Sequence, residues 1–369
     1  MSIEKRKLMF VIPSLEGGGA EKVLVDIISN LNNKKYRVML VLFNAKGIFL
    51  EKIPPDIEIY DLKKRSKYSI LFLIIKLAFL IRKLKPDNLI GFMHYVNMIT
   101  ILAYKLSNVK SNVIATIHTN ILKVINRTWL GPVKFFLYKQ TFKNADHLIV
   151  PSEGIKKMME NDFKITAHKI RTIPHPLLVN KITQLANEKL DPPFNDKKYI
   201  LSVGRLTEAK GYKHLLNAYK IISKQNNINL VILGVGEDQK MLETLAENLG
   251  LTDRIIFAGF QKNPYKFMKN ASLFVLSSLW ESFGVVLCEA MLCSVPIVST
   301  DCPSGPGELI TNEVNGLLVK TCDVPGLANA MDRVLNNEND AEKFTKEGLK
   351  KAYSLNIYNI IPLYEDLFV

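Results

Sequence analysis

The sequence predicts an α/β protein with two doubly wound domains, each built on a parallel sheet covered by helices on both faces. Short, nearly continuous apolar runs rich in β-branched residues alternate with helix-length segments. The alternation stops at about 177–198 and then starts again. A chain of 369 residues is also too long for one comfortable core and suits two domains.

The apolar runs give the expected strands in order. In the first half they are 8–12, 37–43, 88–91, 112–117 and 147–150. In the second half they are 199–203, 229–233, 254–257, 272–276 and 296–299. Strands of this kind with helices between them favour two Rossmann-like sheets.

The polar stretch between the two series, which contains Pro192 and Pro193, is typical of a linker. We therefore predict an N-terminal domain at 1–180, a linker at 181–198 and a C-terminal domain at 199–369. The amphipathic stretch 356–368 serves no later strand and is the candidate to cross back to the first domain. Ligands of open α/β sheets bind at the carboxyl ends of the strands, so two such domains would face each other across a binding cleft.

The net charge of +14 is distributed unevenly. Residues 1–180 hold 29 Lys and Arg against 13 Asp and Glu, whereas residues 181–369 hold 20 against 22. A basic surface attracts polyanions, so anionic lipid and nucleic acid are both candidates. The chain shows no recognition helix, zinc finger or RNA-binding motif. We therefore expect no nucleic-acid partner.

Cysteine usage and hydropathy favour a cytoplasmic protein. The four cysteines contain no Cys-x-x-Cys pair, which is typical of reduced thiols and not of a disulfide framework or zinc cluster. The apolar run 8–12 is too short for a secretory signal. The longest apolar stretch, 70–81, is interrupted by Lys76 and falls short of the roughly 20 residues that a spanning helix needs.

A glycine-rich turn follows the first expected strand, with Gly17, Gly18 and Gly19 before a helix. Glycines there let backbone N–H groups approach an anion at the helix N-terminus. The pattern is neither the dinucleotide fingerprint nor a P-loop. A simple tight turn explains the same residues.

Two cations follow the first strand of the second domain. Arg205 and Lys210 lie in a Gly-Arg-x4-Lys-Gly segment at 204–211. Together they can clamp a diphosphate and neutralise charge that develops on a phosphate leaving group. Surface ion pairing is the alternative.

Two acids lie eight residues apart in the segment 279–290. Glu281 falls in a loop after the strand at 272–276, and Glu289 falls one to two turns into the next helix. The amides from Phe283 to Val285, around Gly284, open that helix and can bind phosphate. A carboxylate accepts two hydrogen bonds from a vicinal diol, so the segment predicts a receptor for a sugar, a diphosphate and a ribose.

These three segments, in this order and spacing, resemble glycosyltransferase family 4, a retaining family with the GT-B fold. The resemblance covers essentially the whole chain. The loops 234–237 and 258–260 also fall where that family has its characteristic loops. The segment 301–308 resembles the version in members that build lipid-linked or surface polysaccharides.

The resemblance implies roles for the residues that match. Arg205 and Lys210 would hold the donor diphosphate, and Glu289 the donor ribose. Glu281 would bind the transferred sugar together with the amides at 283–285. The remaining implied contacts are Gly17, Gly18 and Gly19 with the diphosphate, Gly259 and Phe260 with the nucleobase, and His118 with the reacting sugar. A structural role is the alternative for His118, which ends an expected strand.

The resemblance further implies transfer of a hexose or N-acetylhexosamine from a nucleotide diphosphate sugar, with UDP expected, to a glycan or lipid-linked acceptor. The departing phosphate can take the acceptor proton, so we assign no general base. No Asp-x-Asp triplet occurs, and we expect no metal or other cofactor. One departure from the family is His175, which stands where Asn-Gly or Asn-Pro is more usual.

A membrane or acceptor contact is predicted at 70–84. Phe72, Lys76, Phe79 and Lys83 form one helical stripe, and Ile70, Ile74, Leu77 and Ile81 form another that can pack on the sheet. The first stripe, with Lys63, Lys64, Arg65 and Lys67 nearby, can meet anionic headgroups on the inner face of the cell membrane. An ordinary sheet-covering helix with solvated lysines is the alternative.

Two other classes of function compete with glycosyl transfer. A GT-B enzyme of another kind, such as a sugar-nucleotide epimerase or a phosphorylase, would suit the same acids and cations. A basic nucleic-acid-binding protein is the non-enzyme alternative.

Overall fold

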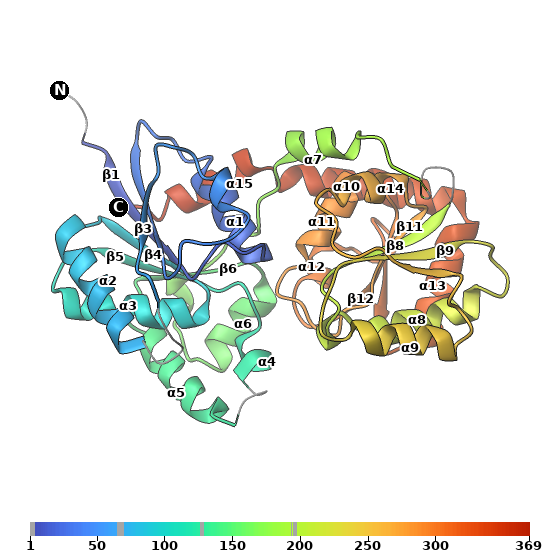
Figure 1. Ribbon diagram of the computed structural model, residues 1–369, viewed down its shortest axis with the longest axis horizontal. Coiled ribbons are helices and arrows are strands. Elements are labelled where there is room, and N and C mark those ends of the chain that lie inside the picture. The colour runs from blue at the N-terminus through green and yellow to red at the C-terminus, as the bar shows by residue number, and fades with distance from the viewer. Residues whose placement is uncertain (1–3, 65–69, 126–128, 193, 195–197) are drawn as a thin grey trace. The chain divides into compact units, whose positions relative to one another are not determined.

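The computed structural model describes residues 4–64, 70–125, 129–192, 194 and 198–369. The chain divides into two compact units (Figure 1). Unit 1 comprises Met1–Pro176 and Ile357–Val369, and unit 2 comprises Leu177–Asn356. Each unit contains a parallel sheet with helices on both faces, so the predicted fold class is confirmed.

The strands of unit 1 pair in parallel in the order β3-β2-β1-β4-β5-β6-β7. Its inner strands are almost continuously buried because helices cover both sides of the sheet. The strands are β1 (Arg6–Ile12), β2 (Tyr36–Leu42), β3 (Glu58–Asp61), β4 (Asn88–Phe92), β5 (Asn112–Thr116), β6 (His147–Val150) and β7 (Ile170–Thr172).

Two helical layers cover this sheet. Helices α2, α3 and α5 pack side by side on one face, and α1 and α15 meet on the other (Figure 1). The helices of unit 1 are α1 (Gly19–Ile28), α2 (Ile70–Leu84), α3 (His94–Ser107), α4 (Ile121–Ile125), α5 (Gly131–Phe142), α6 (Glu153–Asn161) and α15 (Ile357–Glu365), with single turns η1 (Leu50–Lys52) and η2 (Ala167–Lys169).

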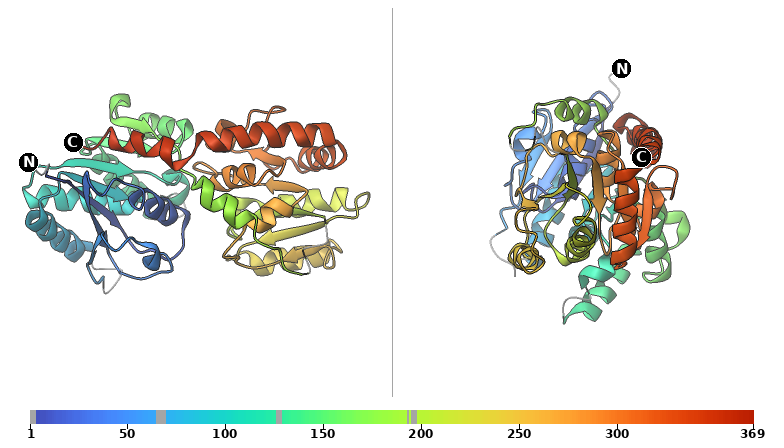
Figure 2. Two further views of the ribbon diagram at one scale, coloured as in Figure 1. Left: turned by 90° about the horizontal axis from the view of Figure 1, so that it is seen from above. Right: turned by 90° about the vertical axis from the view of Figure 1, so that its right-hand side faces the viewer.

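The C-terminus is fixed to the amino edge of the unit 1 sheet, near the start of the chain (Figure 2). The Arg6 guanidinium donates to the Phe368 carbonyl at 3.0 Å. The side-chain amides of Asn88 and Asn112 donate to the carbonyls of Val369 and Leu367 at 2.9 and 2.7 Å. The residues after α15 thus tie the end of the chain to unit 1 at the edge opposite the carboxyl ends of the strands, and α15 belongs to the same unit.

The strands of unit 2 pair in parallel in the order β10-β9-β8-β11-β12-β13. One core lies between the sheet and α7, α10, α11 and α14, and the other lies between the sheet and α8, α9 and α13. The strands are β8 (Tyr199–Val203), β9 (Asn229–Leu233), β10 (Ile255–Phe257), β11 (Leu273–Leu276), β12 (Ile297–Asp301) and β13 (Leu317–Lys320). The helices are α7 (Val179–Ala186), α8 (Tyr212–Ile222), α9 (Gln239–Asn248), α10 (Tyr265–Asn270), α11 (Val285–Leu292), α12 (Pro306–Leu309), α13 (Val324–Asn336) and α14 (Glu338–Ser354), with the single turn η3 (Glu208–Lys210).

The observed boundaries differ from the predicted domains 1–180 and 199–369. Part of the predicted linker at 181–198 is helix α7, whose Ile182 and Ala186 are buried in the core of unit 2. The polar residues on the outer face of α7 made this segment resemble a linker in the sequence. Pro193 lies outside the described residues.

Candidate functional site

Both sheets reverse their strand order at one point, between β1 and β4 in unit 1 and between β8 and β11 in unit 2. Loops that leave neighbouring strands in opposite directions open a crevice at the carboxyl edge of such a sheet. In unit 2 the loops are 204–211 and 277–284, which contain two of the sequence motifs. The topology thus brings these motifs to one edge of one sheet.

The two loops of unit 2 are joined by their backbones. The Leu279 amide donates to the Ala209 carbonyl at 2.8 Å, and the Ser277 hydroxyl donates to the Lys210 carbonyl at 2.8 Å. Gly211 has a φ of +61°, and a Cβ there would lie 2.1 Å from the Ser277 carbonyl oxygen. Glycine is required because the loops approach too closely for any side chain.

Lys210 and Glu281 form an ion pair across this join. The Lys210 Nζ lies 2.5 Å from Glu281 Oε1, and the side chains are 21% and 12% exposed. The Ser278 hydroxyl donates to the same carboxylate oxygen at 2.8 Å. The Ser304 hydroxyl donates to the Glu281 carbonyl at 2.8 Å, which links the segment 301–308 to the same loop.

Arg205 and Glu289 occupy different surroundings on the same unit. The Arg205 side chain is exposed beside the carboxyl end of β8. Glu289 lies in the second turn of α11, is buried, and accepts a hydrogen bond from the Tyr265 hydroxyl at 3.0 Å. Sequence reasoning missed Tyr265 because nothing in its local pattern separates it from a core aromatic residue.

The start of α11 is shaped by close backbone packing. Gly284 is its N-cap with a φ of +91°, and no side chain caps the first turn that Val285 begins. Phe283 is buried, and a Cβ on Gly305 would lie 2.4 Å from the Phe283 carbonyl oxygen. The amides of this turn therefore lie on a fixed backbone beside the Lys210–Glu281 pair.

The loops after β9 and β10 meet at the same edge of unit 2. The Gly234 amide donates to the Gly259 carbonyl at 2.8 Å. Gly259 has a φ of +66°, and the Phe260 side chain is 60% exposed. An exposed aromatic ring on a rigid turn offers a stacking surface for a planar ligand.

The glycine turn of unit 1 is already engaged by an acid from its own helix. The amides of Gly17 and Gly18 donate to Glu21 Oε2 at 2.7 and 3.0 Å. Glu21 is buried, and this capping arrangement holds the turn that precedes α1 at Gly19. Two of the amides predicted to bind phosphate are thus occupied by a carboxylate, a role of Glu21 that the sequence reasoning missed.

His118 lies in a stack of three rings at the carboxyl edge of unit 1. Its ring centroid is 4.7 Å from that of Phe92 and 5.1 Å from that of His175, with interplanar angles of 18° and 16°. Burial lowers the pKa of His118 well below its ordinary value and that of His175 to about 4. Both imidazoles are therefore neutral near pH 7.

The hydrogen bonds fix the tautomer of His118. The Thr116 hydroxyl donates its only proton to the Gly91 carbonyl at 2.8 Å, so it can only accept from His118 Nε2, 2.8 Å away. The ring therefore carries its proton on Nε2, and Nδ1 keeps a lone pair. Nδ1 is buried with no hydrogen-bond partner among the described residues. It is a pre-formed acceptor for a hydroxyl or amide.

Helix α2 carries the predicted membrane stripe in modified form. Phe72, Phe79 and Lys83 are exposed as expected. The side chain of Lys76 instead folds back against the protein. Its Nζ donates to the Leu62 carbonyl at 2.8 Å and lies 4.6 Å from the centroid of the Phe72 ring. The buried stripe also differs from the predicted one: it comprises Leu73, Leu77, Ala78 and Ile81, whereas Ile70 is exposed and Ile74 is only partly buried. Arg65 and Lys67 lie outside the described residues.

The described part of the chain contains no group of three or more His, Cys, Asp or Glu that could hold a metal ion. Within the same residues, no helix is both long and apolar enough to cross a bilayer. Cys288, Cys293 and Cys302 are buried free thiols, and Cys322 is exposed.

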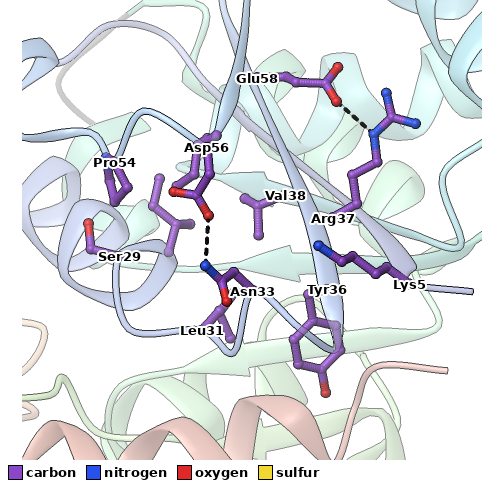
Figure 3. A pocket seen from close by; sticks show the side chains of 12 residues that line it. Lys5, Ser29, Leu31, Asn33, Tyr36, Arg37, Val38, Pro54, Asp56 and Glu58 are labelled. Carbon is purple, nitrogen blue, oxygen red and sulfur yellow. Dashed lines mark hydrogen bonds and ion pairs between the residues drawn. The ribbon is translucent and has the colours of Figure 1, made fainter. Parts of the chain in front are cut away.

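A pocket of about 400 Å³ lies in unit 1 at the opposite edge, beside the amino ends of β1, β2 and β3 (Figure 3). Its polar lining is paired internally, with Arg37 Nε 2.6 Å from Glu58 Oε1 and Asn33 Nδ2 3.3 Å from Asp56 Oδ2. Ligands of open α/β sheets bind at the carboxyl edge, and no sequence motif faces this pocket. We assign it no function.

Comparison with known proteins relates this chain to glycosyltransferases. Residues 186–351 match the family described as "Glycosyl transferases group 1", and residues 17–177 match "Glycosyltransferase Family 4". The crystal structure of Anabaena Alr3699/HepE in complex with UDP and glucose superposes with a TM-score of 0.83 at 20% identity, covering 98% of both chains. That likeness shows the GT-B fold.

Sequence relatives identify the family. The chain is 31% identical to a 4-alpha-N-acetylgalactosaminyltransferase from Campylobacter jejuni whose named substrate is an N-acetylgalactosamine-N,N'-diacetylbacillosaminyl-diphospho-undecaprenol, over 94% of this chain and 93% of that one. It is 33% identical to the uncharacterized glycosyltransferase MJ1059 of Methanocaldococcus jannaschii, over 67% of this chain and 64% of that one. The chain therefore belongs to glycosyltransferase family 4.

Proposed function

We propose that this glycosyltransferase moves a hexose or N-acetylhexosamine from UDP to a lipid-linked or other glycan acceptor during synthesis of a cell-surface polysaccharide, with retention at the anomeric carbon. The observation that carries the proposal is the Lys210–Glu281 pair at the switch point of unit 2. It joins the two motif loops at the edge where open α/β sheets bind ligands.

The donor site is proposed on unit 2. Arg205, which is exposed, and Lys210 bind the two phosphates. Glu281, already fixed by the Ser278 hydroxyl, accepts hydrogen bonds from the transferred sugar. Glu289, held by the Tyr265 hydroxyl, binds the ribose diol, and Phe260 lies against the base. Gly284 and Val285 begin the helix whose first amides bind phosphate.

For unit 1 we propose the contacts that the family resemblance implies. The bare Nδ1 of His118 accepts a hydrogen bond from a hydroxyl of the reacting sugar. Gly19 opens α1 with its amide directed to the diphosphate, because Gly17 and Gly18 are engaged by Glu21.

Charge stabilisation at the leaving group is the principal catalytic effect in this proposal. As the sugar–phosphate bond breaks, negative charge grows on the departing diphosphate, and the cations Arg205 and Lys210 and a helix N-terminus oppose it. The acceptor hydroxyl attacks from the same face, and its proton passes to the departing phosphate oxygen. No separate base or metal ion is then required.

A lipid-linked acceptor is supported by the relatives, since the Campylobacter enzyme is named for a diphospho-undecaprenol substrate. We propose that the protein acts peripherally at the inner face of the cell membrane. On α2, Phe79 and Lys83 are the exposed contacts of the predicted stripe. Lys83→Glu tests it more cleanly than Lys76→Glu, because Lys76 also holds the Leu62 carbonyl.

The function is tested with a panel of nucleotide sugars. Thermal-shift measurements select the donor that raises the unfolding temperature, and transfer of radiolabelled sugar from that donor to a membrane extract measures activity. We expect one UDP-sugar to stabilise the protein and its label to appear in extracted lipid. Release of free epimerised sugar nucleotide without transfer would overturn the proposal.

A further inference from the structure

We propose that the outward face of α2, α3 and α5, with Trp129 and Leu130 just before α5, docks on an anionic bilayer and inserts Trp129 and Phe136 at the headgroup boundary. This bilayer-docking surface rests on the proposed function for its choice of substrate, because it would deliver a lipid-linked acceptor. The surface itself is argued from exposure, position and charge.

Large apolar side chains gather on this layer. Trp129, just before α5, is 90% exposed, and Leu71 and Phe79 on α2 are 70% and 68% exposed. The other exposed apolar residues on these helices, on the neighbouring α4 and before α5 are Ile70, Phe72, Ile75, Leu102, Leu106, Val124, Leu130, Val133, Phe136 and Leu137. On unit 2 exposed apolar residues occur singly on separate elements, as with Ile221 on α8 and Met241 on α9. Contiguous apolar exposure of the first kind marks an interaction surface.

The apolar residues lie on neighbouring helices of one layer. Helix α2 packs on α3, and α3 packs on α5, all on the same face of the unit 1 sheet (Figure 1). Each helix runs from the carboxyl edge of the sheet towards the amino end of the next strand. Trp129 and the first turns of the three helices therefore lie towards the carboxyl edge, where His118 follows β5. A lipid headgroup held by this surface approaches the edge that carries the site.

The charge of the same region selects an anionic occupant. Between residues 62 and 145 the sequence contains 15 Lys and Arg and one acid, Asp87. This segment has a net charge of +14, which equals the net charge of the whole chain. Lys83, Lys105 and Lys123 are exposed on α2, α3 and α4. Exposed aromatic residues among cations are typical of helices that lie in the interface of an anionic membrane.

The same charge argues against a second copy of the chain. Two such faces would bring the exposed lysines Lys83, Lys105 and Lys123 of both copies together, and Asp87 is the only acid that the sequence of each segment offers to pair them. An anionic bilayer satisfies both features at once, because its headgroups neutralise the lysines and its acyl boundary receives Trp129 and Phe136.

Fluorescence tests insertion directly, because Trp129 and Trp280 are the chain's two tryptophans and Trp280 lies in a loop of unit 2. The protein is mixed, without nucleotide sugar, with vesicles of phosphatidylglycerol and phosphatidylcholine in equal parts whose acyl chains carry bromine. We expect bromine to quench the emission of the wild-type protein. Trp129→Phe should bind the vesicles but lose the quenching, and vesicles of phosphatidylcholine alone should quench weakly.

Flotation with the same vesicles measures binding. Trp129→Ser with Phe136→Ser should weaken partitioning about tenfold, and Lys83→Glu with Lys105→Glu should abolish most of it. The matched controls Ile221→Ser with Met241→Ser, and Lys213→Glu with Lys240→Glu, change exposed residues of the same types on unit 2 and should bind normally.

Three results would overturn the proposal. The first is that the wild-type protein fails to float with the vesicles, and the second is that bromine still quenches the emission of Trp129→Phe. The third is that the wild-type protein sediments as a dimer and the Trp129→Ser variant as a monomer. None of these assays contains donor or acceptor. Their failure would therefore leave transfer to a soluble acceptor, and with it the proposed function, open to its own test.

Discussion

The imidazole rings of His118 and His175 lie stacked in unit 1, with their centroids 5.1 Å apart and their planes at 16°. Both are buried, and the positive charge of either ring would disfavour protonation of the other. His175 thus helps to keep His118 neutral, with Nδ1 available as an acceptor.

This stack predicts a pH dependence of stability. The pKa of His175 is lowered from 6.5 to about 4, so between these values the unfolded chain binds a proton that the folded chain does not. Stability is therefore full above the unfolded pKa and falls as the pH drops towards 4, by about 3 kcal/mol for this group. His175→Phe keeps a ring against His118 but cannot titrate, so its stability should fall less over this range.

Urea unfolding at a series of pH values measures the difference. His94, whose pKa is also lowered to about 4, is present in both proteins and contributes equally to the pH dependence of their unfolding free energies. Equal slopes for His175→Phe and the wild type would show that the stack does not control protonation.

Lys210→Met should reduce turnover strongly with little loss of fold. In the proposed mechanism it removes a cation that opposes leaving-group charge, and the loss of such a group costs about 10²- to 10³-fold in kcat. Initial rates with saturating donor measure it. Lys213→Met, an exposed lysine on α8, is the control and should transfer at the normal rate. Full activity in Lys210→Met would remove the residue from the donor site.

The central strands could be predicted from sequence because burial on both faces produces continuous apolar runs. Strands β6, β8 and β9 have the predicted bounds. The chain also contains β3, β7 and β13, which the sequence reasoning missed. Each has three or four residues at a sheet edge. Charged residues interrupt the apolar pattern of β3 and β7, and the run in β13 contains only three apolar residues, Leu317 to Val319, which is too short to identify as a strand.

The motifs of the candidate site could be predicted from the sequence, but the contacts between their side chains could not. Glu281 and Lys210 could each be placed at the rim of a sheet, but their contact joins residues 71 positions apart. Glu21 and Tyr265 were missed because an acid in a first helical turn and a buried aromatic residue are common without function. Only the fold shows what their oxygen atoms bind.

Gly211→Ala should destabilise the protein and impair the site together. Its φ of +61° disfavours alanine by about 1 kcal/mol, and the added Cβ would lie 2.1 Å from the Ser277 carbonyl oxygen. The loops must then separate, which moves Lys210. Gly250 is the control, because it has a similar φ of +66° and a Cβ there would meet only the Lys220 Nζ, at 3.9 Å. Gly250→Ala therefore measures the cost of the backbone conformation without a clash. Thermal unfolding should show a clearly larger loss for Gly211→Ala.

Turnover should survive removal of divalent metal. In the proposed donor site, Arg205, Lys210 and the start of α11 would supply the positive charge for which metal-dependent enzymes use a cation. Initial rates are compared in excess chelator, in untreated buffer and with added Mg²⁺. Similar rates are expected in all three, and complete loss in chelator, restored by Mg²⁺, would refute metal independence.

Glu21→Ala should loosen the glycine turn of unit 1. Its carboxylate accepts from the amides of Gly17 and Gly18 at 2.7 and 3.0 Å in a buried position, and its loss leaves two donors unpaired. We expect a loss of about 1–2 kcal/mol in the free energy of unfolding and a higher KM for the donor. Glu21→Gln keeps an acceptor oxygen on a side chain of the same length and should recover most of both. If Glu21→Ala were as stable as the wild type, the carboxylate would not be what holds this turn.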